Sequence, residues 1–275
     1  MKTKSKKVSV KMLTESAIMI ALATVLSFIK LWDFPAGGSI TIASMFPIAV
    51  IAYRYGAPWG IFTAIVHGIV QQLVSLSTLS YVTTWQSVVA VILLDYIVAF
   101  AVIGLAGIFR KKISRPSTAL IMGSLLACVL RYLCHVISGA TVWAGLSIPN
   151  EAALLYSISY NATYMIPETI ILLLVALYMG ENIDFTKSTI TRIKQENLAK
   201  GTVWMLPVAG LMTLGALVYD IVAIFGRLQN EDGVFDLSGI ANVNWLVFAI
   251  VNAIAAAIIL TLVIVYKVKQ KKAAN

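Results

Sequence analysis

Polar side chains that could bind a small molecule occur in otherwise apolar sequence between residues 95 and 161. They comprise a carboxylate, an imidazole, an indole, phenols and an amide: Asp95, Tyr96, His135, Trp143, Tyr156 and Asn161. A carboxylate receives hydrogen-bond donors or a cation, an indole face attracts a cation, and imidazole and amide groups orient a ring. A few polar groups in an apolar surround are typical of a small-molecule site.

No pattern for covalent or hydrolytic chemistry accompanies these residues. The sequence lacks a Gly-x-x-x-x-Gly-Lys-Ser/Thr phosphate loop, which excludes ATP hydrolysis by that route. No His, Cys and carboxylate cluster has metal-ligand spacing, and no Ser or Cys lies in a nucleophile elbow. Cys128 and Cys134 lie on different sides of one predicted helix, so we interpret them as core residues. We therefore predict a binding or transport protein with no metal or cofactor, and not an enzyme.

The composition indicates that membrane-spanning helices must position these residues. Of the 275 residues, 60% are hydrophobic and 12% charged, with a mean hydropathy of +0.89, whereas soluble domains carry about 25% charge. A spanning helix needs about 20 apolar residues. We predict an all-α polytopic membrane protein with eight spans, at about 13–31, 40–53, 58–76, 86–109, 117–140, 152–179, 203–226 and 244–266.

The basic residues predict the orientation of these spans. They gather beside apolar segments at Lys2–Lys11, Arg110–Arg115 and Lys267–Lys272, which is the positive-inside pattern. With the N-terminus inside, all of the 21 Lys and Arg residues lie inside except Lys30, Arg131 and Arg227. Both termini are therefore predicted to be cytoplasmic. The net charge of +9 reflects membrane topology and does not indicate a nucleic-acid partner.

This topology predicts that the polar groups share one depth. From the rise of a helix, Asp95 and Asn161 lie about 13 Å below the outer face, and His135 and Tyr156 about 6–7 Å. Trp143 lies at the outer mouth. A carboxylate facing lipid costs about 2.5–3.5 kcal/mol, so Asp95 must face inward, toward either a ligand or Arg131.

Three other features have two interpretations each. Glu168, which follows Pro167, either pairs with Arg131 or marks a proton or coupling site. The stretch from Asp33 to Ser39 is either a simple turn or a lid that carries Gly37 and Gly38. The small residues Ala17 and Ala21 permit a close helix contact, either inside the protein or with a partner.

Residues 181–202 interleave charged and apolar side chains, which predicts an amphipathic helix on the inner membrane surface. This linker divides the chain into three parts. They are a six-helix membrane domain at 1–180, an amphipathic cytoplasmic linker at 181–202, and a two-helix membrane extension at 203–275.

Five stretches carry a resemblance to a known family: Leu13–Ala23, Pro35–Ser39, Leu94–Phe100, Arg131–Trp143 and Tyr156–Asn161. Together they resemble the thiamine-specific substrate-binding (S) components of energy-coupling factor (ECF) vitamin transporters, over roughly residues 10–180. The family often has a glutamate at the position of Asp95, and it has six helices where eight are predicted here.

The resemblance implies a role for each matching residue. Asp95 would bind the aminopyrimidine with Tyr96 beside it, and Trp143 would stack on the cationic thiazolium. The remaining ring contacts would come from His135, Tyr156 and Asn161; the lid would contain Gly37, Gly38 and Ser39; and the coupling protein would dock at Ala17 and Ala21.

The resulting hypothesis is high-affinity thiamine binding and uptake at a bacterial cell membrane. The partners implied are the lipid bilayer, a transmembrane coupling protein and two ATPase subunits, which alone would use ATP. The alternative is a solitary proton-coupled secondary transporter for thiamine or another cationic aromatic compound, which Glu168 and the extra helices motivate.

Overall fold

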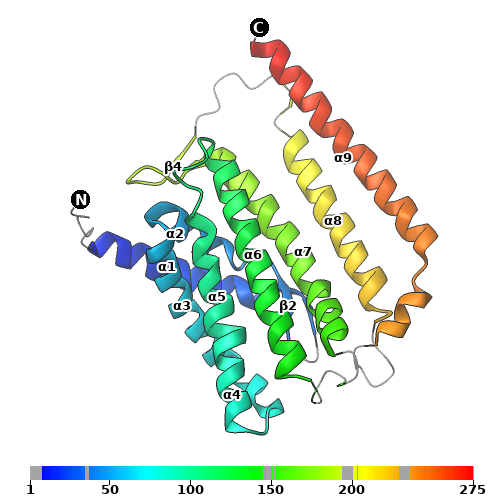
Figure 1. Cartoon of the computed structure of the whole chain (residues 1–275). Coiled ribbons are helices and arrows are strands. Elements are labelled where there is room, and N and C mark those ends of the chain that lie inside the picture. Colours follow the sequence, from blue (N-terminus) through cyan, green and yellow to red (C-terminus); the bar gives the residue numbers. More distant parts are fainter. Residues whose placement is uncertain are drawn as a thin grey trace. The chain divides into compact units, whose positions relative to one another are not determined.

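The structure is a computed structural model that describes residues 8–34, 37–144, 146, 150, 153–193, 201–202, 204–228 and 236–274 (Figure 1). The chain divides into two compact units. The first comprises Met1–Lys30 and Ser39–Thr191, and the second comprises Leu31–Gly38 and Arg192–Asn275.

The first unit is a bundle of helices. Its long elements are α1 (Val10–Phe28), α3 (Ala57–Val74), α6 (Pro116–Thr141) and α7 (Ala153–Asn182). Between α3 and α6 lies a composite span, which corresponds to the fourth span predicted from the sequence and is called the fourth span below. That span runs through α4 (Trp85–Val91), a π-helical segment η2 (Ile92–Val98), α5 (Ala99–Ala101) and a 3₁₀ segment η3 (Val102–Gly107). The shorter elements are β2 (Ser39–Thr41), α2 (Phe46–Tyr55), the 3₁₀ segment η1 (Leu76–Tyr81) and β3 (Ile183–Asp184).

One of the eight predicted spans does not correspond to a long helix in the described residues. Among the described residues, seven helices are long and apolar enough to cross a bilayer. The exception is the prediction at 40–53, where the structure has β2 and the 10-residue helix α2, which is about 15 Å long at 1.5 Å per residue. Phe46 through Tyr53 are all buried. This apolar run is therefore a core helix of the bundle. The cytoplasmic location of both termini remains a prediction.

Close backbone contacts hold the middle of the bundle together. A Cβ on Gly104 of η3 would lie 2.1 Å from the Ile61 nitrogen of α3, and a Cβ on Gly123 of α6 would lie 1.9 Å from the Ala106 carbonyl oxygen. No side chain fits at either distance. Small residues at such positions let membrane helices approach closely, and here they bring η3 against both α3 and α6.

The prediction of an amphipathic helix at residues 181–202 is wrong for the part of this linker that the structure describes. Helix α7 continues to Asn182, and the chain then forms β3 and, at Thr191–Arg192, β4. Where β3 ends, the Asp184 carboxylate accepts hydrogen bonds from the hydroxyl and backbone nitrogen of Thr186, and these bonds lower the pKa of Asp184. This Asx-type turn competes with helical geometry. Residues 194–200 lie outside the described part.

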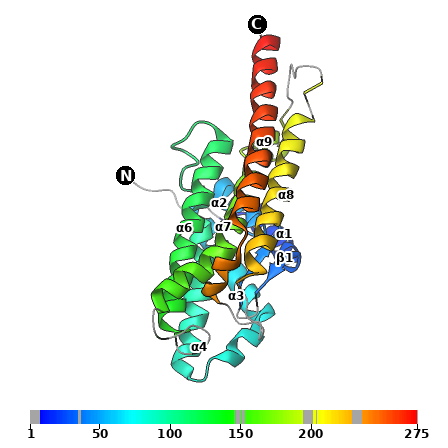
Figure 2. The same ribbon diagram turned by 90° about the vertical axis from the view of Figure 1, so that its right-hand side faces the viewer.

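The second unit contains a helical hairpin. Helices α8 (Met205–Phe225) and α9 (Trp245–Ala274) lie side by side in both views (Figures 1 and 2). The 3₁₀ segment η4 (Leu237–Asn242) precedes α9, and strand β1 (Lys30–Asp33) begins at the boundary of the two units. Asn252 Nδ2 donates to Asp220 Oδ1 at 2.7 Å, so the hairpin contains an interhelical polar contact.

Candidate functional site

Asp95 is the centre of the candidate binding site. It lies in the π-helical segment η2, and such segments occur frequently at functional sites. Its carboxylate contacts His135 Nδ1 at 2.9 Å and accepts hydrogen bonds from Ser138 Oγ at 2.6 Å and Trp143 Nε1 at 3.1 Å. The fourth span, helix α6 and the chain that follows α6 therefore meet at one carboxylate. Their depth in the membrane, and their role as a binding site, remain predictions.

Trp143, which donates to this carboxylate, belongs to a cluster of apolar and aromatic side chains. Trp143 is 8% exposed and forms an apolar cluster with Val82 and Val91, against which Tyr96 and Tyr156 pack. The Tyr96 hydroxyl donates to Thr78 Oγ1 at 3.3 Å, which ties the ring to η1. The site therefore combines one anionic group with an indole and two phenol rings, an arrangement that suits a cationic or donor-bearing aromatic ligand.

Asn161 lies beside His135, but its hydrogen bonds are made within the protein. Its Nδ2 donates to the His135 carbonyl at 3.3 Å and the Ser157 carbonyl at 2.9 Å, and its Oδ1 accepts a bond from the Tyr164 hydroxyl. The Tyr164 ring meets the His135 ring edge-on at 6.3 Å. Asn161 therefore fixes α7 against the part of α6 that carries His135, so its geometry fits a positioning role.

Arg131 does not pair with Asp95. Its Nη1 lies 3.4 Å from Glu168 Oε2, and the two side chains are 12% and 3% exposed. Glu168 also accepts a hydrogen bond from Thr41 Oγ1 at 2.6 Å, and the Arg131 guanidinium lies over the Phe100 ring at 4.6 Å. Glu168 therefore forms the ion pair with Arg131. The Asp95 carboxylate contacts His135, Ser138 and Trp143 instead.

Sequence reasoning missed three residues that support the site. Ser138 is fully buried and holds Asp95, Tyr164 holds Asn161, and Thr41 holds Glu168. Ser138 follows His135 by three residues, and Tyr164 follows Asn161 by three. Residues at this spacing lie on one helix face, so this signal could have identified both. No comparable spacing pointed to Thr41, which lies in strand β2.

The predicted lid residues are divided between the two units. Gly37 and Gly38 have φ values of +94° and +86°, in a turn where Phe34 donates to the Gly38 carbonyl at 3.1 Å; glycine is needed for such a backbone. Both belong to the second unit, whereas Ser39 begins β2 in the first. Pro35 and Ala36 lie outside the described residues. The role of this segment as a lid remains a prediction.

Ala17 and Ala21 are exposed on α1. Packing inside the first unit therefore does not account for these two small residues, although the neighbouring Ala23 is fully buried. No group of three or more His, Cys, Asp or Glu residues within the described ranges could hold a metal ion.

These features are those of a helical membrane protein with a cluster of polar and aromatic side chains inside its first unit, and comparison with known proteins identifies its family. Residues 13–186 match the family described as thiamine transporter protein (Thia_YuaJ), and the chain belongs to this thiamine transporter family. It is therefore a transport protein rather than an enzyme, and a multi-pass protein of the bacterial cell membrane.

Two relatives show how much of the chain the likeness covers. The chain is 36% identical over 170 residues to the thiamine transporter ThiT of Bacillus subtilis (strain 168), an alignment that covers 58% of this chain and 84% of that protein. A solved structure of ThiT from Listeria monocytogenes is similar with a TM-score of 0.51 and 25% identity, over 62% of this chain and 92% of the other. Helices α8 and α9 lie beyond the residues that the family matches.

Proposed function

We propose that this protein binds thiamine with high affinity and delivers it into the cell as the substrate-binding component of an ECF-type transporter. Membership of the thiamine transporter family supports thiamine uptake as the function. The ECF arrangement, in which a transmembrane coupling protein and two ATPases supply the energy, is our inference from the resemblance of the sequence. The chain carries no phosphate loop of its own, which is consistent with this division of labour.

The observation that carries the proposal is the environment of Asp95. Three donors hold its carboxylate among the rings of Tyr96, Trp143 and Tyr156. Thiamine offers an aminopyrimidine with hydrogen-bond donors and a permanently charged thiazolium ring. A half-buried carboxylate suits the first, and an indole face suits the second, since a desolvated cation–π contact contributes about 2 kcal/mol.

Within this proposal the site residues divide by role. Asp95, Tyr96, His135, Trp143 and Tyr156 contact the vitamin. His135 Nε2 is buried and makes no hydrogen bond within the described residues, so it is available to a ligand, while Nδ1 is engaged by Asp95. Asn161 orients the wall between α6 and α7.

The exposed face of α1 is the proposed contact with the coupling protein. Ala17 and Ala21 lie one helical turn apart and are exposed, and small residues at this spacing let a second helix approach closely. Substitution of either alanine by tryptophan is expected to abolish uptake and leave thiamine binding intact.

Uptake measurements separate this proposal from the solitary proton-coupled alternative. Cells that express the protein without any ECF coupling protein and ATPases should bind thiamine but not concentrate it. Concentrative uptake in such cells, sensitive to a protonophore, would favour the alternative. The structure offers that alternative little support, because Glu168 already has Arg131 and Thr41 as partners.

A further inference from the structure

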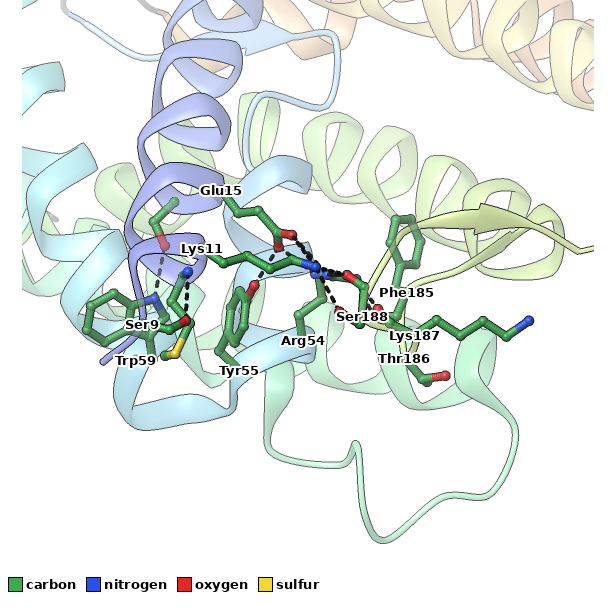
Figure 3. A network of polar contacts seen from close by, with 12 residues as sticks. Ser9, Lys11, Glu15, Arg54, Tyr55, Trp59, Phe185, Thr186, Lys187 and Ser188 are labelled. Atoms are coloured by element: carbon green, nitrogen blue, oxygen red, sulfur yellow. Dashed lines mark hydrogen bonds and ion pairs between the residues drawn. The ribbon is translucent and has the colours of Figure 1, made fainter. Parts of the chain in front are cut away.

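A second polar cluster lies in the first unit, where α1 begins and α2 ends (Figure 3). Arg54 forms a two-pronged ion pair with Glu15, with Nε–Oε2 at 2.9 Å and Nη2–Oε1 at 3.2 Å. The Tyr55 hydroxyl donates to the same Glu15 carboxylate at 2.6 Å. Bidentate pairs of this kind are strong and fix the orientation of both side chains.

The same guanidinium also holds the segment that follows α7. It donates to the carbonyl oxygens of Phe185 at 2.8 Å, Lys187 at 3.2 Å and Ser188 at 3.1 Å. The Arg54 side chain is only 4% exposed. One cation therefore joins α1, α2 and residues 185–188, and Figure 3 shows these contacts converging on it. A lysine could not make this set of contacts, because its ammonium has no planar fork of donors.

Helix α1 depends on such polar contacts to a degree that the other long helices of the first unit do not. Only Ser16 and Ala23 of its 19 residues are buried. Its other polar contacts include hydrogen bonds from Trp59 Nε1 to Ser16 Oγ at 2.9 Å, from Gln71 Nε2 to Ser27 Oγ at 3.1 Å and from Lys11 Nζ to Ser188 Oγ at 3.0 Å. Lipid is as apolar as leucine, so exposed apolar side chains give α1 no drive to pack against the bundle. Polar contacts must set its position.

The Arg54 cluster is far from the binding site. Helix α7 carries Asn161 near its first residues and ends at Asn182, directly before the segment that Arg54 holds. The 21 residues between these positions span about 31 Å of helix. Substitutions in the cluster therefore do not touch the groups around Asp95.

We propose that Arg54 is a positioning residue for transport: it holds α1 in the orientation that uptake requires and takes no part in capturing thiamine. This inference rests on the proposed function, in which the exposed face of α1 meets the coupling protein. Without the Arg54 contacts, α1 keeps its helical structure, but only the Tyr55–Glu15 and Lys11–Ser188 contacts of this cluster still hold it to α2 and residues 185–188. Its orientation is then less firmly fixed.

The test compares Arg54→Met and Arg54→Lys with a matched control. Arg115→Met is the control, because Arg115 forms an ion pair with Glu181 at 2.9 Å that is much more exposed, at 67% and 35%, and does not involve α1. Thiamine affinity of the purified proteins is measured by tryptophan fluorescence. Uptake of labelled thiamine is measured in cells that supply an ECF module and lack other thiamine uptake.

Arg54→Met should leave the Kd of thiamine within about threefold of the starting protein and reduce uptake about tenfold or more, the latter corresponding to a loss of about 1.4 kcal/mol in the coupled step. Arg54→Lys should give an uptake rate between those of the starting protein and Arg54→Met. Arg115→Met should change neither the Kd nor the uptake. Unchanged uptake in Arg54→Met, a parallel loss of binding and uptake, or an equal defect in Arg115→Met would each overturn the proposal.

A distance measurement tests the position of α1 without thiamine. Spin labels are attached to cysteines at Ile18 on α1 and Leu177 on α7, both exposed, in a background where Cys128 and Cys134 are serine. The distance distribution should broaden in Arg54→Met and stay narrow in Arg115→Met. A narrow distribution in both would overturn the proposal. If the starting protein fails to bind thiamine, the proposed function is wrong, and this measurement still decides the role of Arg54.

Discussion

Replacing Asp95 by asparagine should separate ligand binding from folding at the candidate site. The substitution keeps the size of the side chain and removes its charge. In the structure the carboxylate faces three donor atoms, on His135, Ser138 and Trp143. An asparagine offers one acceptor oxygen in their place and turns an NH₂ group toward the remaining donors.

The expected magnitude follows from the loss of a charged partner in a desolvated site. Truncating one partner of a buried, hydrogen-bonded charged contact costs about 2–5 kcal/mol in binding. At about 1.4 kcal/mol per factor of ten, the lower end corresponds to an increase of about 30-fold in the Kd of thiamine. The internal hydrogen bonds to the charge are worth about 1.5–3 kcal/mol each, so the melting temperature should also fall.

Ser138→Ala is the matched control for this variant. It removes one donor from Asp95 but leaves the charge that the ligand meets. We expect a lower melting temperature with a much smaller change in Kd, both measured on purified protein by fluorescence titration and thermal unfolding. Folded Asp95→Asn protein with a Kd within about threefold of the starting protein would refute the assignment, because a 2 kcal/mol loss cannot be hidden in that range.

Three further substitutions test other parts of the account. Trp143→Ala should raise the Kd of thiamine about tenfold or more, since buried aromatic contacts commonly cost about 2 kcal/mol when truncated, and Trp143→Phe should raise it less. A titration that gives Trp143→Ala the same affinity as the starting protein would contradict stacking. Glu168→Gln should destabilise the protein by about 3–5 kcal/mol, because it leaves Arg131 buried without its carboxylate. In thermal unfolding, the double variant with Arg131→Met should recover much of that stability, and no recovery would contradict the ion pair. Asn252→Ala should cost about 0.6–1.7 kcal/mol through the lost contact with Asp220 and leave thiamine binding unchanged, so a large change in Kd would assign α8 and α9 a role in the site.

The meeting of the site residues was predictable because it depends on coarse geometry. A helix advances 1.5 Å per residue, so counting from the predicted membrane boundaries placed Asp95, His135 and Asn161 in the same half of the bilayer. The contacts of Asp95 with His135 and Trp143 agree with that estimate. The family resemblance pointed to the same residues independently.

The partner of Arg131 was not predictable from the same geometry. Depth estimates with boundaries uncertain by a few residues leave both Asp95 and Glu168 within reach of a long guanidinium side chain. The choice depends on the rotation of each helix about its axis. The π-helical segment Ile92–Val98 changes that rotation for the fourth span, and sequence periodicity does not reveal it. Thr41, which completes the Glu168 contacts, depends on tertiary structure alone.

The second predicted span does not correspond to a long helix, and the reason is different. Hydropathy measures how apolar a segment is, not what surrounds it, and a short apolar run suits a buried core helix as well as a membrane span. The 10 residues of α2 are mostly buried, so their apolar character serves the bundle. The linker after α7 was misjudged because the Asp184–Thr186 turn outweighs the amphipathic pattern of its neighbours.

If the proposed function is correct, the site around Asp95 and Trp143 captures thiamine. The most direct test is a titration of the purified protein with thiamine while its tryptophan fluorescence is recorded, with Trp143→Phe as the reporter control. The account predicts a saturable change complete at micromolar thiamine or below, with an amplitude that falls sharply in Trp143→Phe. No fluorescence change and no thermal stabilisation at micromolar thiamine would contradict it.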